Sequence, residues 1–276
     1  MSEILLPGTR AGPFRTPRNM AAEAKGSIHD DATATKLGFR GGTVAGSIHL
    51  DQFVPHLLET WGDAWFETGD LSLYFTQATV DQEEMQCAVA PDGDRLRLTM
   101  HNRQGAMICQ GTASACPDGA SELARRFETQ TASAAGTLRI LAAIQVGDEN
   151  RDLPVRVAPE TLVRSLSVIT ERVAAYETGV LPPSLAVHMA HMTREAVMVK
   201  STRPRVALYG ALEVQHLAGP LKVGVDYLAR TKVLKLSESP KTENIWYEVI
   251  FAADGRDIAR VLYFLRVLKG SSPLWA

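Results

Sequence analysis

The sequence has few cysteines, no long apolar run and almost no net charge, and each shortage excludes a class of protein. Its three cysteines, Cys87, Cys109 and Cys116, are an odd number without metal-like spacing, so they predict neither a disulfide framework nor a metal site. No apolar run approaches the roughly 20 residues that span a bilayer. With 29 Lys and Arg against 31 Asp and Glu, scattered along the chain, no basic face indicates nucleic acid as a partner.

Several familiar motifs are missing as well. The glycine-rich segment 38–42 has neither the lysine of a phosphate-binding loop nor the spacing of a dinucleotide-binding turn. No Gly-x-Ser-x-Gly elbow occurs, and the first 20 residues lack the apolar core of a signal peptide. We therefore expect a cytoplasmic protein without metal or cofactor, whose partner is neither nucleic acid nor membrane.

What is present is enough apolar material for a large core. The 276 residues are 45% hydrophobic, which suits one large domain or two of ordinary size. Residues 1–22 contain three prolines and predict an extended lead-in. The segment 46–62 has an approximate apolar stripe and predicts a helix that ends at Gly62, with Pro55 kinking or splitting it.

The pattern that follows this helix occurs twice. Strands are expected at 71–78, 84–90, 95–101 and 106–115, and a Pro-, Gly- and Ser-rich linker at 117–136. Helices are then expected at 159–179 and 182–199, with strands at 207–217, 221–239, 243–253 and 258–269. We interpret the chain as an α+β tandem duplication with halves 1–120 and 121–276, each an antiparallel sheet wrapped around a central helix.

The stretch "GSIHDDATATKLGFRGGTVAGSIH", residues 26–49, carries a resemblance to a known family. It resembles the signature of the MaoC-like hydratases and dehydratases, the R-specific enoyl-thioester hydratases of the hot-dog fold. The matching residues are Ile28, His29, Asp31, Gly38, Phe39 and Gly46, and "PLKVGVDY" (220–227) resembles a later strand entry of that fold. The resemblance implies a double hot-dog, with the site in the first half and a degenerate second half that shapes the acyl pocket.

The sequence departs from the family signature at four places. The family's catalytic Asp falls on Ala24, and the signature's Asn and Pro fall on Gly26 and Ser27. The family's His before the helix glycine falls on Ala45. Of the family's Asp and His, only the His remains.

The resemblance assigns roles to a small set of residues. His29 would move the proton, and the Gly46 amide would hold the thioester oxygen, because a glycine at a helix N-terminus admits close approach. Asp31 is a candidate partner of His29, with Glu23 as another, although Asp30 or Asp31 also suits the N-cap of a short helix after His29. For substrate binding we expect Arg40 at a phosphate of coenzyme A or a carrier protein, and Ser47, His49 and Phe53 on the central helix.

Three functions remain open. The first is hydration of an α,β-unsaturated acyl thioester, or dehydration of the 3-hydroxyacyl form. The second is a hot-dog isomerase, cyclase or dehydratase that uses His29 without the Asp, and the third is a non-catalytic binder of acyl groups. A thioesterase would need a carboxylate on the central helix, where Asp51 is the candidate, and His188 and His191 are assigned to packing. A homodimer of double hot-dogs is left open.

Overall fold

An antiparallel sheet of ten strands runs through both halves of the chain. The computed structural model describes residues 7–133 and 136–275, so residues 1–6 of the predicted lead-in lie outside the described residues. The strand order is β1-β3-β4-β5-β2-β7-β10-β9-β8-β6. The strands are β1 (Arg10–Ala11), β2 (Asp70–Phe75), β3 (Met85–Asp92), β4 (Arg95–Asn102), β5 (Met107–Ser114), β6 (Glu149–Val155), β7 (Ala207–His216), β8 (Tyr227–Glu238), β9 (Thr242–Ala253) and β10 (Arg256–Leu268).

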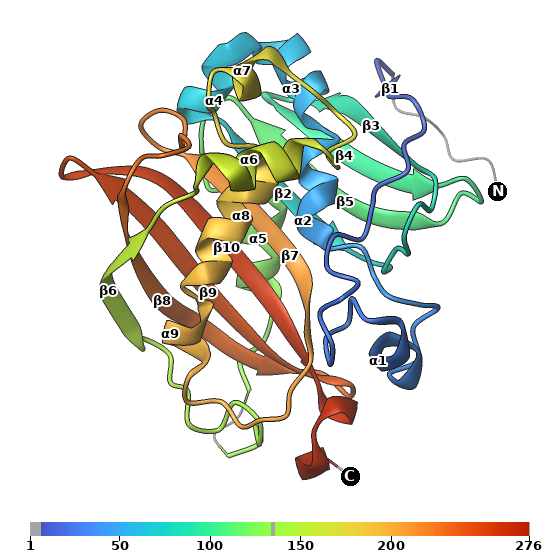
Figure 1. Cartoon of the computed structure of the whole chain (residues 1–276), viewed down its shortest axis with the longest axis vertical. Coiled ribbons are helices and arrows are strands. Elements are labelled where there is room, and N and C mark those ends of the chain that lie inside the picture. Colours follow the sequence, from blue (N-terminus) through green and yellow to red (C-terminus); the bar gives the residue numbers. More distant parts are fainter. Residues whose placement is uncertain (1–6, 134–135, 276) are drawn as a thin grey trace.

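The sheet is two copies of one unit joined at a single strand pair. Strands β2 and β7 pair antiparallel, from Asp70 opposite Gln215 to Tyr74 opposite Ala211. Outward from this pair, the first half continues through β5, β4, β3 and β1, and the second through β10, β9, β8 and β6 (Figure 1). Each half therefore adds its strands in the same order, as the repeated sequence pattern predicts.

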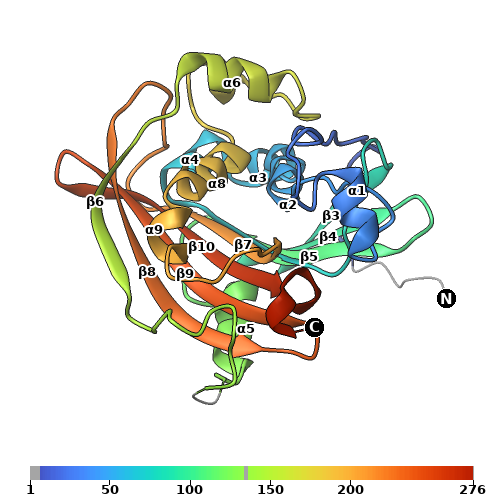
Figure 2. The same cartoon turned by 60° about the horizontal axis from the view of Figure 1, so that its bottom comes forward.

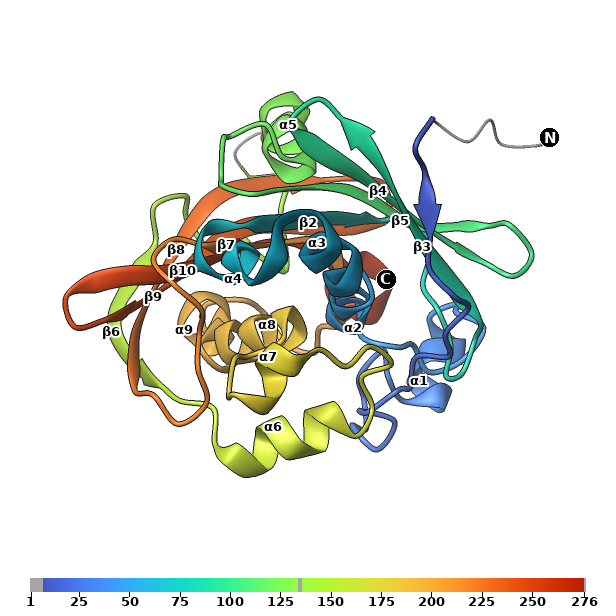
Figure 3. The ribbon, with the colours of Figure 1, turned by 90° about the horizontal axis from the view of Figure 1, so that it is seen from above.

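The helices lie on both faces of the sheet. Figure 3 shows α2, α3, α4, α8 and α9 inside its curve, α6 and α7 beyond them, and α5 on the opposite face. The helices are α1 (Asp31–Lys36), α2 (Gly46–Asp51), α3 (Val54–Trp61), α4 (Trp65–Thr68), α5 (Glu122–Thr129), α6 (Pro159–Leu166), α7 (Ala174–Glu177), α8 (Pro183–Met192) and α9 (Arg194–Met198), with 3₁₀ turns at Gly62–Ala64, Lys269–Ser271 and Pro273–Trp275.

The predicted central helix of the first half is split in two. Pro55 lies in the first turn of α3, where its missing N–H leaves no intrahelical bond unmade, and α2 ends before it. Leu50, Phe53 and Leu57 are fully buried in the main core, which fills the space between the sheet and the central helices. Packing against the sheet thus keeps α2 and α3 in place despite the break.

Several segments differ from the sequence-based expectation: the predicted helix 182–199 is divided into α8 and α9, and β6 was not predicted. The predicted linker 117–136 contains α5, because the Ser121 hydroxyl accepts a hydrogen bond from Ala124 N–H and the buried Leu123 packs on the sheet. The predicted helix 159–179 is instead the two helices α6 and α7, with non-helical chain at 167–173. Short local signals predicted these segments poorly, since tertiary packing decides them.

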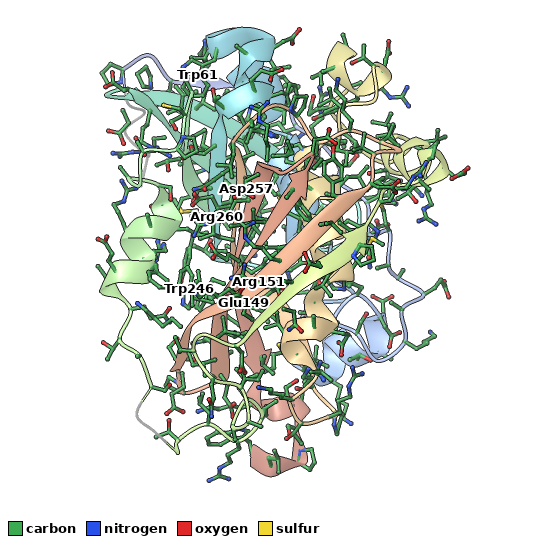
Figure 4. The ribbon with its side chains drawn as sticks, turned by 90° about the vertical axis from the view of Figure 1, so that its left-hand side faces the viewer. Trp61, Glu149, Arg151, Trp246, Asp257 and Arg260 are labelled. Carbon is green, nitrogen blue, oxygen red and sulfur yellow. The ribbon has the colours of Figure 1, made fainter. Side chains whose placement is uncertain are left out.

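The outer face and one edge of the sheet are visible in Figure 4. Trp246 lies toward α5 and packs edge-on against Phe127 of that helix, with ring centroids 5.4 Å apart. Glu149 and Arg151 form an ion pair on the edge strand β6. Charged side chains on an edge strand oppose the addition of another strand.

Candidate active site

A cavity of about 190 Å³ lies where the predicted motif meets the second half of the chain. One wall comes from the segment around His29, the start of α2 and the chain that follows β2, and the other from α8, α9, β7 and β10. Figure 2 shows α1 and α2 on the same face of the sheet as α8 and α9. The cavity therefore draws its walls from both halves, with apolar side chains supplied by Ile28, Phe39, Val44, Phe75, Leu208 and Leu265.

His29 is half-buried in this wall, and one hydrogen bond fixes its ring. Its Nδ1 lies 2.7 Å from the carbonyl oxygen of Thr43. A carbonyl oxygen only accepts, so Nδ1 carries the proton and Nε2 keeps its lone pair. Burial lowers the pKa of His29 below its ordinary value, although the Thr43 carbonyl opposes the shift. The ring is therefore a neutral base near pH 7.

The backbone around His29 is held by close packing of two chain segments. The His29 carbonyl accepts a hydrogen bond from Asn19 Nδ2 at 2.8 Å, and the Ile28 carbonyl accepts one from Thr43 N–H at 3.0 Å. A Cβ on Gly42 would lie only 2.3 Å from the His29 carbonyl oxygen. Glycine at position 42 is therefore a condition for the observed position of His29.

Gly46 is the first residue of α2 and contributes to the cavity wall. A Cβ at this position would lie 2.9 Å from Cζ of Phe75, so the missing side chain admits the close approach of that ring. The N–H groups in the first turn of a helix have no partner within the helix. For Gly46 N–H no acceptor occurs among the described residues either, so this donor is available to a ligand.

His49 also contributes to the cavity wall, and both of its ring nitrogens have protein partners. Nε2 lies 3.0 Å from the Thr79 hydroxyl, and Nδ1 lies 3.5 Å from Gln52 Nε2. Burial lowers the pKa of His49 to about 4, so the ring is neutral at physiological pH. His49 thus lies in the cavity wall with less ring freedom than His29, and its role in substrate binding stays a prediction.

The carboxylates nearest to His29 in sequence do not contribute to the cavity wall. Asp31 begins α1, and its Oδ1 accepts a hydrogen bond from Gly42 N–H at 2.6 Å. Asp30 occupies the N-cap position, where its Oδ2 accepts a hydrogen bond from the Thr33 hydroxyl at 2.7 Å. Glu23 is exposed. Asp31 thus supports the Gly42 turn, and through it the backbone of His29.

The remaining predicted contacts lie elsewhere. Arg40 is exposed and pairs with Glu83, with Nη2 and Oε2 2.6 Å apart. Ser47 is half-buried in the first turn of α2, and Phe53 is fully buried in the main core. Among the described residues that form the cavity wall, none of Arg40, Ser47 and Phe53 is present.

Four polar side chains of the second half line the same cavity, and the sequence did not predict their place there. They are His191 at the end of α8, Arg194 at the start of α9, Tyr209 on β7 and Arg266 on β10. The Tyr209 hydroxyl lies 3.3 Å from His191 Nδ1. Burial lowers the pKa of His191 to about 4, and the positive charges of Arg194 and of protonated His188 and His29 lower it further. His191 and His29 line the same cavity from the two halves of the chain.

A histidine on an otherwise apolar helix was the available signal for this wall. His188 and His191 lie three residues apart, and from the sequence alone we assign both to packing. The structure separates them, because His188 is exposed while His191 reaches the cavity. Their different surroundings depend on the approach of the first half, which local sequence does not encode.

Asp51 lies at the end of α2, away from the cavity. Its Oδ1 accepts a hydrogen bond from Ser184 N–H at 2.9 Å, in the first turn of α8. Its Oδ2 is buried and has no partner among the described residues. Burial raises the pKa of Asp51 to about 7, while the bond from Ser184 opposes the shift. Asp51 therefore links the two central helices and does not contact the cavity as a thioesterase carboxylate would.

The second half has no donor in the place of Gly46. The segments that lead into the two central helices each form an isolated antiparallel bridge, at Thr43 and at Val180. Three residues later α2 begins at Gly46 and α8 begins at Pro183. Proline has no N–H, so the counterpart of the Gly46 amide is missing.

No group of three or more His, Cys, Asp or Glu side chains that could hold a metal ion occurs within 7–133 and 136–275. In the same ranges, no helix has both the length and the apolarity to cross a membrane.

Solved structures with a similar fold include proteins described as dehydratases. No family model matches the chain, and no curated protein matches its sequence. A protein assigned as a MaoC-domain dehydratase from Chloroflexus aurantiacus J-10-fl has a similar structure, with a TM-score of 0.63 and 10% identity over 96% of this chain and 95% of that one. A conserved hypothetical protein of Mycobacterium tuberculosis with a double hotdog fold gives 0.57 and 12%, covering 95% and 97% of the two chains.

A third similar structure contains an acyl thioester. It is the dehydratase domain of PpsC from Mycobacterium tuberculosis in complex with C12:1-CoA, with a TM-score of 0.51 and 12% identity over 95% of both chains. Identities this low show the fold alone. The predicted α+β double hot-dog is confirmed, and so is the resemblance to MaoC-like dehydratases at the level of the fold.

Proposed function

We propose that this protein adds water to an α,β-unsaturated acyl thioester, or removes it from the 3-hydroxyacyl form. The observation that carries the proposal is the state of His29, a neutral imidazole whose Nε2 lone pair is free, in the wall of a partly apolar cavity. The fold shared with MaoC-like dehydratases supports the same chemistry.

One base moves the proton in both steps of the proposed reaction. His29 Nε2 takes a proton from water, the water oxygen bonds to the β-carbon, and the electron pair of the double bond shifts toward the thioester oxygen. The Gly46 N–H donates a hydrogen bond to that oxygen as its negative charge develops. The imidazolium then returns its proton to the α-carbon, which regenerates the thioester and completes the addition of one water molecule.

The second half supplies the wall opposite His29 in this proposal. Ala24, at the place of the family's Asp, is exposed and leaves His29 without a carboxylate partner there. The His191–Tyr209 pair offers uncharged polar atoms that hold the water or the β-hydroxyl group. Since Pro183 replaces the glycine donor, we assign the reaction to the first half and a pocket-forming role to the second.

A change of reaction within the same fold is the second candidate. The observation that favours it is the exposed Ala24, because a site with one base suits an isomerase or cyclase that moves a proton without adding water. In this case His29 takes a proton from the substrate and returns it at another carbon, and the Gly46 amide keeps its role.

The first test is turnover of enoyl-CoA thioesters of short, medium, long and aromatic type. We expect loss of the conjugated-enoyl absorbance with the wild-type protein and a fall of about 100-fold or more in kcat for His29→Ala, since it removes the general base. His188→Gln is the matched control, because His188 lies exposed on α8 outside the cavity wall, and it should retain wild-type rates.

Three outcomes separate the functions. Turnover that persists in His29→Ala contradicts the role of His29. A rearranged acyl product without gain of water favours the second candidate. Binding of every thioester without any conversion, unchanged in His29→Ala, identifies a binding protein.

A further inference from the structure

A groove of about 560 Å³ adjoins the cavity on the side of the second half. It shares Arg194, Ala207 and Leu265 with the cavity wall, so the two spaces are neighbours across these side chains. Its lining comes from α9, from the chain that connects α9 with β7, and from β7 and β10. Figure 1 shows the course of this connection. Its other lining residues are Glu195, Met198, Arg203, Pro204 and Arg205.

The groove holds an excess of positive charge. Arg203 and Arg205 share one carboxylate, with Nη2 atoms 2.6 Å and 3.2 Å from the two oxygens of Glu195. Arg194 adds a third guanidinium, for which no ion pair occurs among the described residues. Three arginines therefore face one carboxylate, which leaves a charge of +2 at the edge of the cavity.

Part of this charge is removed from water. The Arg205 side chain is only 8% exposed, although it shares its single carboxylate with Arg203. Burial lowers the pKa of Arg205, and the neighbouring Arg203 and Arg194 lower it further, while Glu195 acts in the opposite direction. Each guanidinium has five N–H donors, and each bond to Glu195 uses one nitrogen, so donors remain for an anion.

From this arrangement we infer that the groove binds the diphosphate of coenzyme A, whose thioester then enters the cavity past Arg194. A diphosphate supplies the negative charge that the groove lacks, and arginine forks match phosphate oxygens. This inference rests on the proposed function for the choice of a thioester ligand. Arg40 is a poorer candidate for the same role, because it is paired with Glu83 and lies outside the cavity wall.

The test measures binding without turnover. Coenzyme A, 4′-phosphopantetheine and pantetheine are titrated by calorimetry into the wild-type protein and into the double variant Arg194→Gln/Arg203→Gln. We expect the double variant to bind coenzyme A at least about tenfold more weakly, since charge-assisted hydrogen bonds are lost, and to lose less affinity for pantetheine, which carries no phosphate. Arg256→Gln, exposed at the start of β10 and absent from the groove lining, is the control and should bind as the wild type does. Arg205 is left intact because its burial gives it a structural role.

Each other result overturns the inference. Coenzyme A binding that survives the double substitution shows that the phosphates lie elsewhere. Equal affinities for coenzyme A and 4′-phosphopantetheine exclude the diphosphate and favour a carrier-bound single phosphate. The His29→Ala assay tests the proposed reaction separately. Binding of coenzyme A that depends on the arginines, without turnover, supports the groove and contradicts hydration. Turnover together with binding that does not depend on the arginines supports hydration and contradicts the groove.

Discussion

Three histidines line one cavity, and their hydrogen bonds constrain their ring nitrogens to different degrees. His49 contacts Thr79 and Gln52 through both ring nitrogens, and His191 contacts Tyr209 through Nδ1. His29 uses Nδ1 for a backbone carbonyl, which leaves the basic nitrogen free. Burial lowers the pKa of all three rings, so each is neutral near pH 7. Only for His29 does the partner fix a free lone pair on the other nitrogen, because the Thr43 carbonyl must accept, whereas the Tyr209 hydroxyl beside His191 can donate or accept.

The sequence identified two of these histidines and assigned the third to packing. His29 and His49 fall within a contiguous motif, where spacing predicts that they meet. His191 joins them from 142 positions beyond His49 along the chain, through the pairing of the two halves. A single sequence shows such a residue only as one polar side chain on an apolar helix, a pattern that core packing produces as well.

Asp51 gives a prediction on stability. Because the pKa of Asp51 is raised to about 7 in the folded protein, the folded state keeps a proton that the unfolded chain has already released at the same pH. The contribution of this proton to the free energy of unfolding is lost as the pH rises from about 4 through 7. Asp51→Asn keeps an oxygen for Ser184 N–H and removes the charge. When the pH is raised from 5 to 8, we expect the difference in unfolding free energy between this variant and the wild type to shift by about 3 kcal/mol in favour of the variant.

Urea denaturation at the two pH values measures this difference. Asp226→Asn is the control, because the Asp226 side chain is 82% exposed and should show no comparable gain. A constant difference between wild type and Asp51→Asn across the pH range would contradict the burial of a protonated carboxyl group.

At the scale of elements, residue types with strong local preferences predicted the structure best. Alternating strands and the break near Pro55 follow from backbone geometry, and both occur as expected. Helix α5 within the predicted linker does not follow from composition. It is an eight-residue helix held by a cap, by Arg126 and Arg125 paired with Glu122, and by Leu123 against the sheet. Most of its stability comes from the sheet beneath it, and no local window contains that information.

The turn before α2 offers a prediction at this scale. Gly42→Ala would place a Cβ 2.3 Å from the His29 carbonyl oxygen, so the two segments must separate. We expect the free energy of unfolding to fall by about 1–3 kcal/mol, as at other overpacked sites. We also expect kcat to fall by a larger factor than the factor by which KM changes. Gly270→Ala is the matched control, since a Cβ there meets nothing within 4 Å. Wild-type kcat in Gly42→Ala would show that the turn does not position His29.

At the scale of the molecule, the sheet repeats the same arrangement in both halves, whereas the two corresponding sites differ. The cavity has a corresponding position that is generated by the repeat of the two halves, and aromatic side chains occupy it. Trp65 and Phe66 of α4 pack against His216 at the end of β7, and Phe66 also packs against Tyr176 of α7. All four side chains are buried. The sequence predicted the duplication but not this aromatic cluster, because the residues of the cluster come from three separate segments.

One ligand per chain is the expected consequence. Calorimetric titration of a saturated acyl-CoA, which the proposed reaction does not convert, should give a stoichiometry near one. The same titration with Gly46→Val should show weakened binding, because the added side chain meets Phe75 in the cavity wall. A stoichiometry of two would mean that the aromatic cluster opens to admit a second ligand.

The strand pair β2–β7 also affects how the sequences of the two halves can change during evolution. In a symmetric dimer of identical chains, every substitution occurs twice, so a change that suits one site is imposed on the other. Here the pairing from Asp70 to Tyr74 joins two halves that are read from one gene, and each position can change alone. A glycine can therefore persist at the start of α2 while the start of α8 accepts a proline, and the freed half can adapt to the ligand instead of the reaction.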